Sequence, residues 1–184
     1  MRLGLDSHPL VHVTRVTCIL AIRPLPCDHA CPAGQRTCSF TSLLSRQVGQ
    51  FPSKCQNDKC EKDVITRKVL TAMPLVYSLV IVHESHNVSA EDIRQAMEAV
   101  DDVVDVAAIY GLEHAQLAQI KHVNAYAFQH YVAFTWNEMA QQWLLRDDST
   151  CRVVGPTFED VKRKCVENRY QPGLLLYEVR SKQQ

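Results

Sequence analysis

The sequence predicts an α+β fold with a single hydrophobic core. Apolar, β-rich runs of strand length occupy 75–82 and 173–179, and patterns of the capping-box type mark helix starts at Ser89 and Thr157. The chain has 184 residues, of which 46% are apolar, so a core can form without disulfide bonds. We therefore expect strands and short helices packed together in one domain.

The first strand and helix are predicted from the run at 75–82 and the segment after it. That run is apolar throughout, which is typical of a strand buried on both faces. Ser89 with Asp92 three residues later then begins a helix. The apolar face of this helix consists of Ile93, Met97 and Val100. Two further strands are expected within 103–110 and 117–128.

A β-hairpin and a last helix precede the final strand. Residues 130–136 and 141–148 read as two strands around a short loop at 137–140. Thr157 with Asp160 begins the helix. The buried face of this helix is predicted to consist of Phe158, Val161 and Cys165.

Charge and apolar content argue against two classes of partner. Lys plus Arg equals Asp plus Glu at 20 each, so the chain as a whole attracts neither a nucleic-acid backbone nor an anionic membrane. No stretch approaches the ~18 consecutive apolar residues of a membrane span. Eight cysteines without a recognisable secretion signal indicate reduced thiols. We expect a cytoplasmic or nuclear protein.

Composition changes near residue 50. Residues 1–50 contain neither Lys nor Glu, but hold four of the eight cysteines and four of the eight prolines. The remainder carries the regular strand and helix patterns. We expect 1–50 to be an irregular Cys-, Pro- and Arg-rich segment and 51–184 to be the folded unit.

The hairpin brings a histidine and a carboxylate together. A loop at 137–140 sets His130 opposite Asp147 and Phe134 opposite Trp143, with Cβ atoms of each pair about 4.5 to 5.5 Å apart. A carboxylate that accepts an imidazole N–H fixes the ring tautomer and leaves the other nitrogen free to take a proton from a nucleophile. The alternative interpretation is a polar pair on an edge strand without chemistry.

Several motifs around this hairpin occur in a fixed order. They are His-Tyr at 130–131, Trp143, Asp-Asp at 147–148, Val-Gly at 154–155, Asp-Val-x-x-x-Cys from 160 and Gln-Pro-x-Leu-Leu-Leu-Tyr from 171. In this order the chain resembles the C-terminal half of the catalytic domain of ubiquitin-specific proteases, papain-like cysteine peptidases that cleave ubiquitin from proteins. The similarity covers roughly residues 50 to 180 and is nearest to the branch labelled inactive ubiquitin carboxyl-terminal hydrolases.

The resemblance implies a palm-type antiparallel sheet with flanking short helices and without the thumb of the family. It implies His130 as general base, Asp147 as the residue that orients it, and Asp148 as a polar support for the oxyanion or for water. Residues 1–50 are then either a remnant of the fingers or sequence that is not natively folded. His122 is interpreted as a surface or core histidine, and His83 and His86 as solvated loop residues.

The family's nucleophile box is not intact in this sequence. A catalytic thiol needs the start of a helix and a nearby imidazolium to lower its pKa. Cys38 is the one candidate, because Thr37 precedes it and Ser-Leu-Leu follows at 42–44, but the expected Asn is absent. The alternative is that this region forms a later helix of the family that leads into Cys55. Cys18 and Cys165 are predicted to be buried, unreactive thiols.

Cys55 and Cys60 are candidate zinc ligands, because two thiolates this close in sequence can share one tetrahedral ion. The family's fingers carry a second cysteine pair upstream. Here only Cys27, Cys31 and Cys38, with His29 between them, could supply further ligands. The alternative is a pair that binds nothing. This interpretation requires no cofactor, and a structural zinc is compatible with it.

Three functions are compatible with the sequence. The first is a part of a cysteine-type deubiquitinase that carries the His and Asp half of the active site and is inactive as an isolated chain. The second is a non-catalytic domain that binds ubiquitin or acts as a scaffold. The third is an unrelated zinc-binding adaptor. In the first two, ubiquitin or ubiquitinated proteins are the expected partners.

Overall fold

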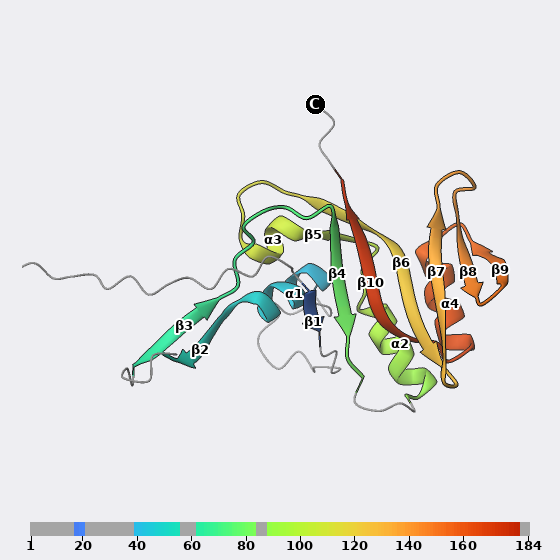
Figure 1. Ribbon diagram of the computed structural model, residues 1–184, viewed down its shortest axis with the longest axis horizontal. Helices are drawn as coiled ribbons and strands as arrows, with labels where there is room; N and C mark the ends of the chain where they lie inside the picture. Colours follow the sequence, from blue (N-terminus) through green and yellow to red (C-terminus); the bar gives the residue numbers. More distant parts are fainter. Residues whose placement is uncertain (1–16, 21–38, 56–61, 84–87, 181–184) are drawn as a thin grey trace, which may run out of the picture.

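The computed structural model describes residues 17–20, 39–55, 62–83 and 88–180 (Figure 1). Along the chain, the elements are β1 (Thr17–Leu20), α1 (Phe40–Val48), β2 (Gln50–Lys54), β3 (Asp63–Arg67), β4 (Val76–Ile81), α2 (Ala90–Glu98), β5 (Val103–Asp105), α3 (Val106–Tyr110), β6 (Leu117–Ala127), β7 (His130–Asn137), β8 (Gln142–Asp147), β9 (Thr150–Gly155), α4 (Phe158–Glu167) and β10 (Gln171–Val179).

The main sheet holds eight strands in the order β1-β4-β10-β6-β7-β8-β9, with β5 paired to β6 beside this path. All of its pairings are antiparallel except that of β1 with β4. Strands β2 and β3 form a separate antiparallel hairpin, which extends away from the main sheet in Figure 1. The expected α+β class and largely antiparallel sheet are therefore confirmed.

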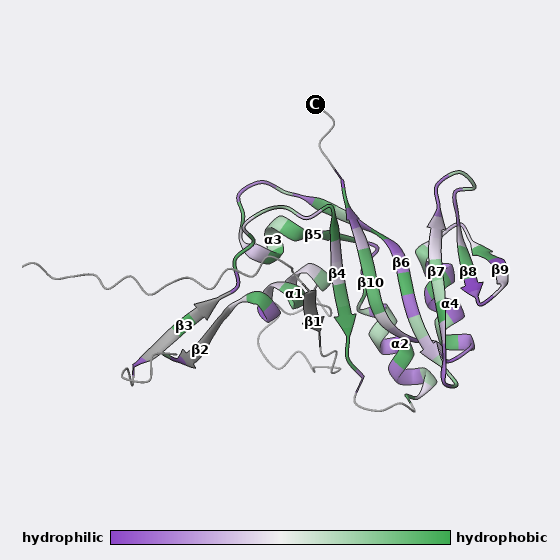
Figure 2. Ribbon diagram, viewed as in Figure 1, coloured by the Kyte–Doolittle hydropathy of each residue, from purple (hydrophilic) through white to green (hydrophobic). Residues whose placement is uncertain are grey.

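The core lies between one face of the sheet and the helices α2 and α4, which pack against each other. Alternate strand residues face this core, so Tyr77, Leu79, Leu175 and Tyr177 are fully buried. Figure 2 shows apolar residues along β4 and β10 and mixed polar and apolar residues on both helices. No helix within the described ranges is long and apolar enough to cross a lipid bilayer.

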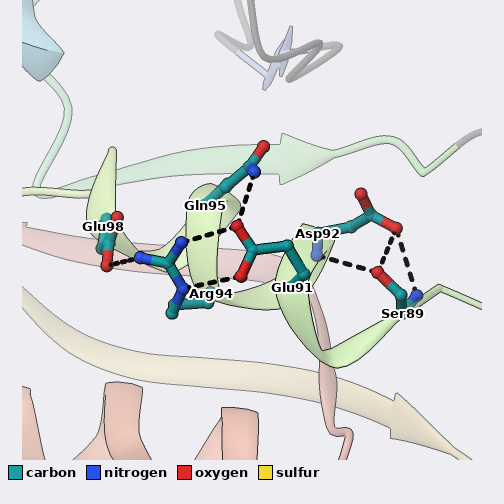
Figure 3. A network of polar contacts seen from close by, with 6 residues as sticks. All are labelled: Ser89, Glu91, Asp92, Arg94, Gln95 and Glu98. Atoms are coloured by element: carbon teal, nitrogen blue, oxygen red, sulfur yellow. Dashed lines mark hydrogen bonds and ion pairs between the residues drawn. The ribbon is translucent and has the colours of Figure 1, made fainter.

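Helix α2 follows its sequence pattern closely. The Ser89 hydroxyl accepts the backbone N–H of Asp92 at 3.1 Å, and the Asp92 carboxylate accepts the backbone N–H of Ser89 at 3.2 Å, which completes the predicted capping box. On the exposed side, Arg94 bridges Glu91 and Glu98 (Figure 3). The hydrogen bond from Arg94 lowers the pKa of Glu91 to about 2. The predicted apolar face is buried in the core.

One strand is as expected and one requires correction. The strand expected within 103–110 is β5, which ends at Asp105, because the Asp105 carboxylate accepts the backbone N–H groups of Ala107 and Ala108 and starts α3. Strand β4 is not buried on both faces. Its Tyr77, Leu79 and Ile81 are buried, whereas Val76 is exposed, because the helices cover only one face of the sheet.

The segment before residue 50 is more regular than expected. It contains β1 and α1, and α1 begins where the Ser39 hydroxyl accepts the backbone N–H of Ser42 at 3.2 Å. Phe40, Leu44 and Val48 of α1 are buried in the common core. Helix α1 fits a helix that leads into Cys55, but a nucleophile at Cys38 would also require a helix start there, so this choice stays a prediction. The division of the chain near residue 50 also stays a prediction.

A tight turn connects β9 to α4. The Thr157 hydroxyl and backbone N–H pair with Asp160 in a second capping box, as the sequence predicts. Asp160 lies against Gly155, where an added Cβ would come within 2.4 Å of the Asp160 carboxyl carbon. The Val-Gly motif therefore leaves room for the residue that caps α4.

We expect Gly155→Ala to lower the free energy of unfolding by about 1 to 3 kcal/mol, because the new methyl group displaces Asp160 from its cap. Gly173→Ala is the matched control, since the nearest atom to its added Cβ is the Asn124 carbonyl oxygen at 3.9 Å. Urea unfolding followed by circular dichroism measures both. Equal losses in the two variants would contradict a specific contact at Gly155.

Candidate active site

His130 is the first residue of β7, placed there by a two-residue turn. Phe128 and Gln129 both have positive φ, at 51° and 65°, which is the backbone of a type I′ hairpin turn. Ala127 pairs with His130 across this turn. A residue other than glycine with positive φ costs backbone strain of order 1 kcal/mol, and this turn contains two such residues. This turn therefore fixes the register of β7 against β6 directly beside the histidine.

Asp147 ends β8 and contacts the histidine ring. The distance from His130 Nε2 to Asp147 Oδ1 is 2.6 Å. An ionised carboxylate only accepts hydrogen bonds, so Nε2 carries the proton and donates. Nδ1 is then the ring nitrogen with a free lone pair. The two side chains are 39% and 38% exposed, so a group from outside the described residues can reach them.

The register of the hairpin differs from the prediction by two residues. Trp136, and not Phe134, pairs with Trp143, and the loop runs over 138–141. The reason is Asn137, whose carboxamide oxygen accepts the backbone N–H groups of Met139 and Ala140 at 3.0 Å and so starts the turn after itself. Because the shift is even, every side chain keeps its face, and His130 reaches Asp147 as a diagonal neighbour.

Asp148 lies beside this pair without joining it. Its carboxylate is 4.0 Å from His130 Nε2, beyond hydrogen-bond distance, and its side chain is 83% exposed. A φ of 48° at Asp148 forms the turn into β9, which the Thr150 hydroxyl closes by donating to the Asp147 carbonyl at 2.8 Å. The three residues form the only group of three or more His, Cys, Asp or Glu side chains within reach of one ion in the described part of the chain.

Two other histidines within the described ranges, His122 and His83, lie apart from this pair. His122 pairs with Thr135 on the opposite face of the sheet, and its Nδ1 lies 3.3 Å from the Thr135 hydroxyl. Burial and the charge of Arg146 lower its pKa. His83 is not the solvated loop residue that was expected, because it is half-buried and donates from Nε2 to the Pro172 carbonyl at 2.8 Å. His86 lies outside the described residues.

None of the described thiols fits a nucleophile for His130. Cys165 is buried as predicted, and burial raises its pKa far above the ordinary value, so it holds its proton. Cys151 is exposed, but it pairs with Arg146, which faces away from His130. Cys55 lies at the end of the β2–β3 hairpin. The candidate Cys38 lies outside the described residues, as does the side chain of Cys18, which the structure places in β1.

The predicted zinc pair is described only in part. Cys55 is half-buried and donates its backbone N–H to the Lys62 carbonyl at 3.1 Å, which closes the β2–β3 hairpin around the stretch that holds Cys60. Cys60 itself lies outside the described residues. Within those residues, no group of three potential ligands forms at Cys55. Zinc binding by Cys55 and Cys60 stays a prediction.

Tyr170 is a neighbour of the site that the sequence pattern does not predict. Its ring packs 5.9 Å from the ring of Phe134, and its backbone N–H donates to the Cys165 carbonyl at 2.9 Å. Burial and the negative charge of Asp147 raise the pKa of Tyr170, while Arg152 lowers it. A neutral phenol therefore lies close to Asp147. Many strands follow an aromatic residue, so the position of Tyr170 just before Gln171 did not indicate that it lies beside the site.

Comparison with known proteins supports the resemblance seen in the motifs. No family model matches the chain. Ubiquitin carboxyl-terminal hydrolase 54 of Rattus norvegicus is 28% identical over 157 residues, and ubiquitin carboxyl-terminal hydrolase 53 of Homo sapiens is 27% identical over 132 residues. These matches cover 78% and 67% of this chain. The chain spans only 10% and 12% of the length of these relatives.

Solved structures share the fold. A chain of a yeast SAGA DUB module superimposes with a TM-score of 0.53 at 14% identity, covering 78% of this chain and 33% of that one. A chain of the SAGA Ubp8/Sgf11/Sus1/Sgf73 DUB module bound to ubiquitin aldehyde gives a TM-score of 0.51 at 15% identity, covering 78% and 34%. The resemblance of this chain to the ubiquitin carboxyl-terminal hydrolases is thereby confirmed.

We expect neutral His130 to be present as the Nε2–H tautomer, because Asp147 accepts that proton. Asp147→Asn removes this preference, whereas Asp148→Asn is the matched control and leaves it unchanged, since Asp148 lies beyond hydrogen-bond distance. Long-range ¹H–¹⁵N NMR at a pH where the ring is neutral distinguishes the tautomers. A mixed tautomer in the unaltered chain, or the same effect from both substitutions, would contradict the assignment.

Proposed function

We propose that this chain is the C-terminal part of a cysteine-type ubiquitin carboxyl-terminal hydrolase domain and acts in protein deubiquitination. The observation that carries the proposal is the 2.6 Å contact between His130 Nε2 and Asp147. Motif order, curated relatives and fold support the same assignment. In this proposal the chain supplies the base of the active site, and a thiol outside the described residues supplies the nucleophile.

Each group at the site has a defined task in this reaction. His130 Nδ1 takes the proton of the thiol, and the thiolate attacks the carbonyl carbon at the ubiquitin C-terminus. The same proton then passes to the leaving amine, and Asp147 stabilises the imidazolium between the two steps. An ionised Asp148 repels an oxyanion but accepts hydrogen bonds from water. Its role is therefore to hold water beside His130.

Ubiquitin or a ubiquitinated protein is the partner that this function requires, and the cytoplasm or nucleus is the compartment that the reduced cysteines favour. Nothing about the exposed His130 and Asp147 pair favours an enzyme over a scaffold by itself, because the same pair can persist without a nucleophile. Reaction and binding experiments therefore have to separate the two functions.

We expect the isolated chain not to react with ubiquitin that carries an electrophilic C-terminus, because a base without a positioned thiolate forms no bond to it. Labelling is measured by the mass shift on intact-protein mass spectrometry. Covalent labelling that disappears in Cys38→Ala but persists in Cys151→Ala would contradict this expectation and identify Cys38 as the nucleophile.

We expect weak or undetectable binding of ubiquitin by the chain alone, and binding when the upstream half of a ubiquitin-specific protease catalytic domain is fused ahead of Met1. When only one wall of a binding channel is present, ubiquitin binding has the full entropic cost of association but forms only part of the contacts. Titration with labelled ubiquitin measures both proteins. No binding by the fusion, together with unfolding of the chain on zinc removal, would favour the zinc-binding adaptor instead.

A further inference from the structure

Strand β9 is the last strand of the main sheet at the end next to the candidate site. Within the described residues its only hydrogen-bonded neighbour is β8. Figure 1 shows β9 at the right-hand margin of the sheet, with α4 behind the same end. Because alternate residues of an edge strand direct their N–H and C=O groups outward, this margin presents a row of backbone donors and acceptors.

The sequence of β9 carries only part of the protection that natural edge strands use, namely the charged Arg152 and an irregularity in the pairing with β8 between Trp143 and Leu144. It reads Thr-Cys-Arg-Val-Val-Gly over 150–155, with three β-branched residues and neither proline nor lysine. The first four residues are exposed, and Val153 is 61% exposed. The strand is therefore open to pairing with another extended chain.

The two faces of β9 differ in chemistry. Arg152 pairs with the buried Leu145, so it projects toward the side of the sheet that α4 covers, whereas Val153 pairs with Leu144 on the other face. Arg152 forms no ion pair with any described residue. A strand added beside β9 would therefore place an acidic side chain next to Arg152 and an apolar one next to Val153.

We propose that the free edge of β9 binds an extended peptide with alternating acidic and apolar residues by adding it as a further strand of the sheet. A second copy of the chain fits less well than such a peptide. Antiparallel pairing of two β9 strands about their centres brings both Arg152 side chains onto one face, opposite or diagonal to each other, where like charges repel. The proposal does not depend on catalysis, although the peptide would end close to Asp147 and Asp148.

The test uses the full chain and a fluorescein-labelled heptapeptide of alternating valine and glutamate with blocked termini, followed by fluorescence anisotropy. We expect saturable binding of the valine and glutamate peptide and about tenfold weaker binding of a valine and lysine peptide. A valine and glutamate peptide with a methylated backbone should not bind, because it cannot form the hydrogen bonds of an added strand. Arg152→Glu should reverse the preference between the two peptides. Lys62→Glu, an equal change of charge on the distant β2–β3 hairpin, should leave it unchanged.

Val153→Pro blocks part of the edge and should weaken binding as well, with circular dichroism confirming that the variant is folded. Three results of the binding experiments would each overturn the proposal. They are no binding at millimolar peptide, equal binding of the methylated peptide, and an unchanged preference in Arg152→Glu. Dimerisation of the chain through β9, seen by sedimentation as a dimer that Val153→Pro abolishes, would overturn it in favour of a second copy.

Discussion

The antiparallel pairing of β7 with β8 is the constraint on which the candidate site depends. His130 begins one strand and Asp147 ends the other, so their contact exists only while the two strands keep their register. A slip by one residue would move the carboxylate to the opposite face of the sheet. The Asn137 side chain starts the turn that sets this register, and the turn at 128–129 fixes β7 against β6 at its other end.

Packing beneath the hairpin keeps those strands in place. Phe134 and Trp143 are buried, and the ring of Trp143 lies 5.7 Å from that of Phe158 at the start of α4. The fit of Gly155 against Asp160 in turn fixes where α4 begins. Motif residues at 155, 160 and 165 therefore have structural tasks, whereas those at 130 and 147 form the polar pair at the surface. A similarity in motif order alone does not separate these two kinds of residue.

Residue patterns predicted the parts of the fold in which local signals and burial agree. Helices α2 and α4 have capping boxes and apolar faces at helical spacing, and both form as expected. The end of β5 was not predictable from its apolar pattern, because the Asp105 side chain turns the chain into a helix there. Strand β9 was missed, since most of its residues are exposed and it has no alternation to detect.

The candidate site was predictable in composition but not in detail. The facing of His130 and Asp147 follows from strand parity, which survives an even error in register, so the contact forms although the predicted pairing was wrong. Tyr170 reaches the same place from the end of α4, through tertiary packing that no local pattern encodes. The thiol partner of His130 has no counterpart among the described cysteines.

In the proposed function, His130 is the base of a thiol hydrolase whose nucleophile lies outside the described residues. The most direct measurement is kcat/KM for release of a fluorogenic group from the ubiquitin C-terminus by the chain fused to an upstream catalytic half that carries the thiol. We expect His130→Gln to lower this value by a factor of about 10³ or more. His122→Gln, on the opposite face of the sheet, should change it by less than about threefold. Equal activity of the unaltered fusion and His130→Gln, or an equal loss in both variants, would contradict it.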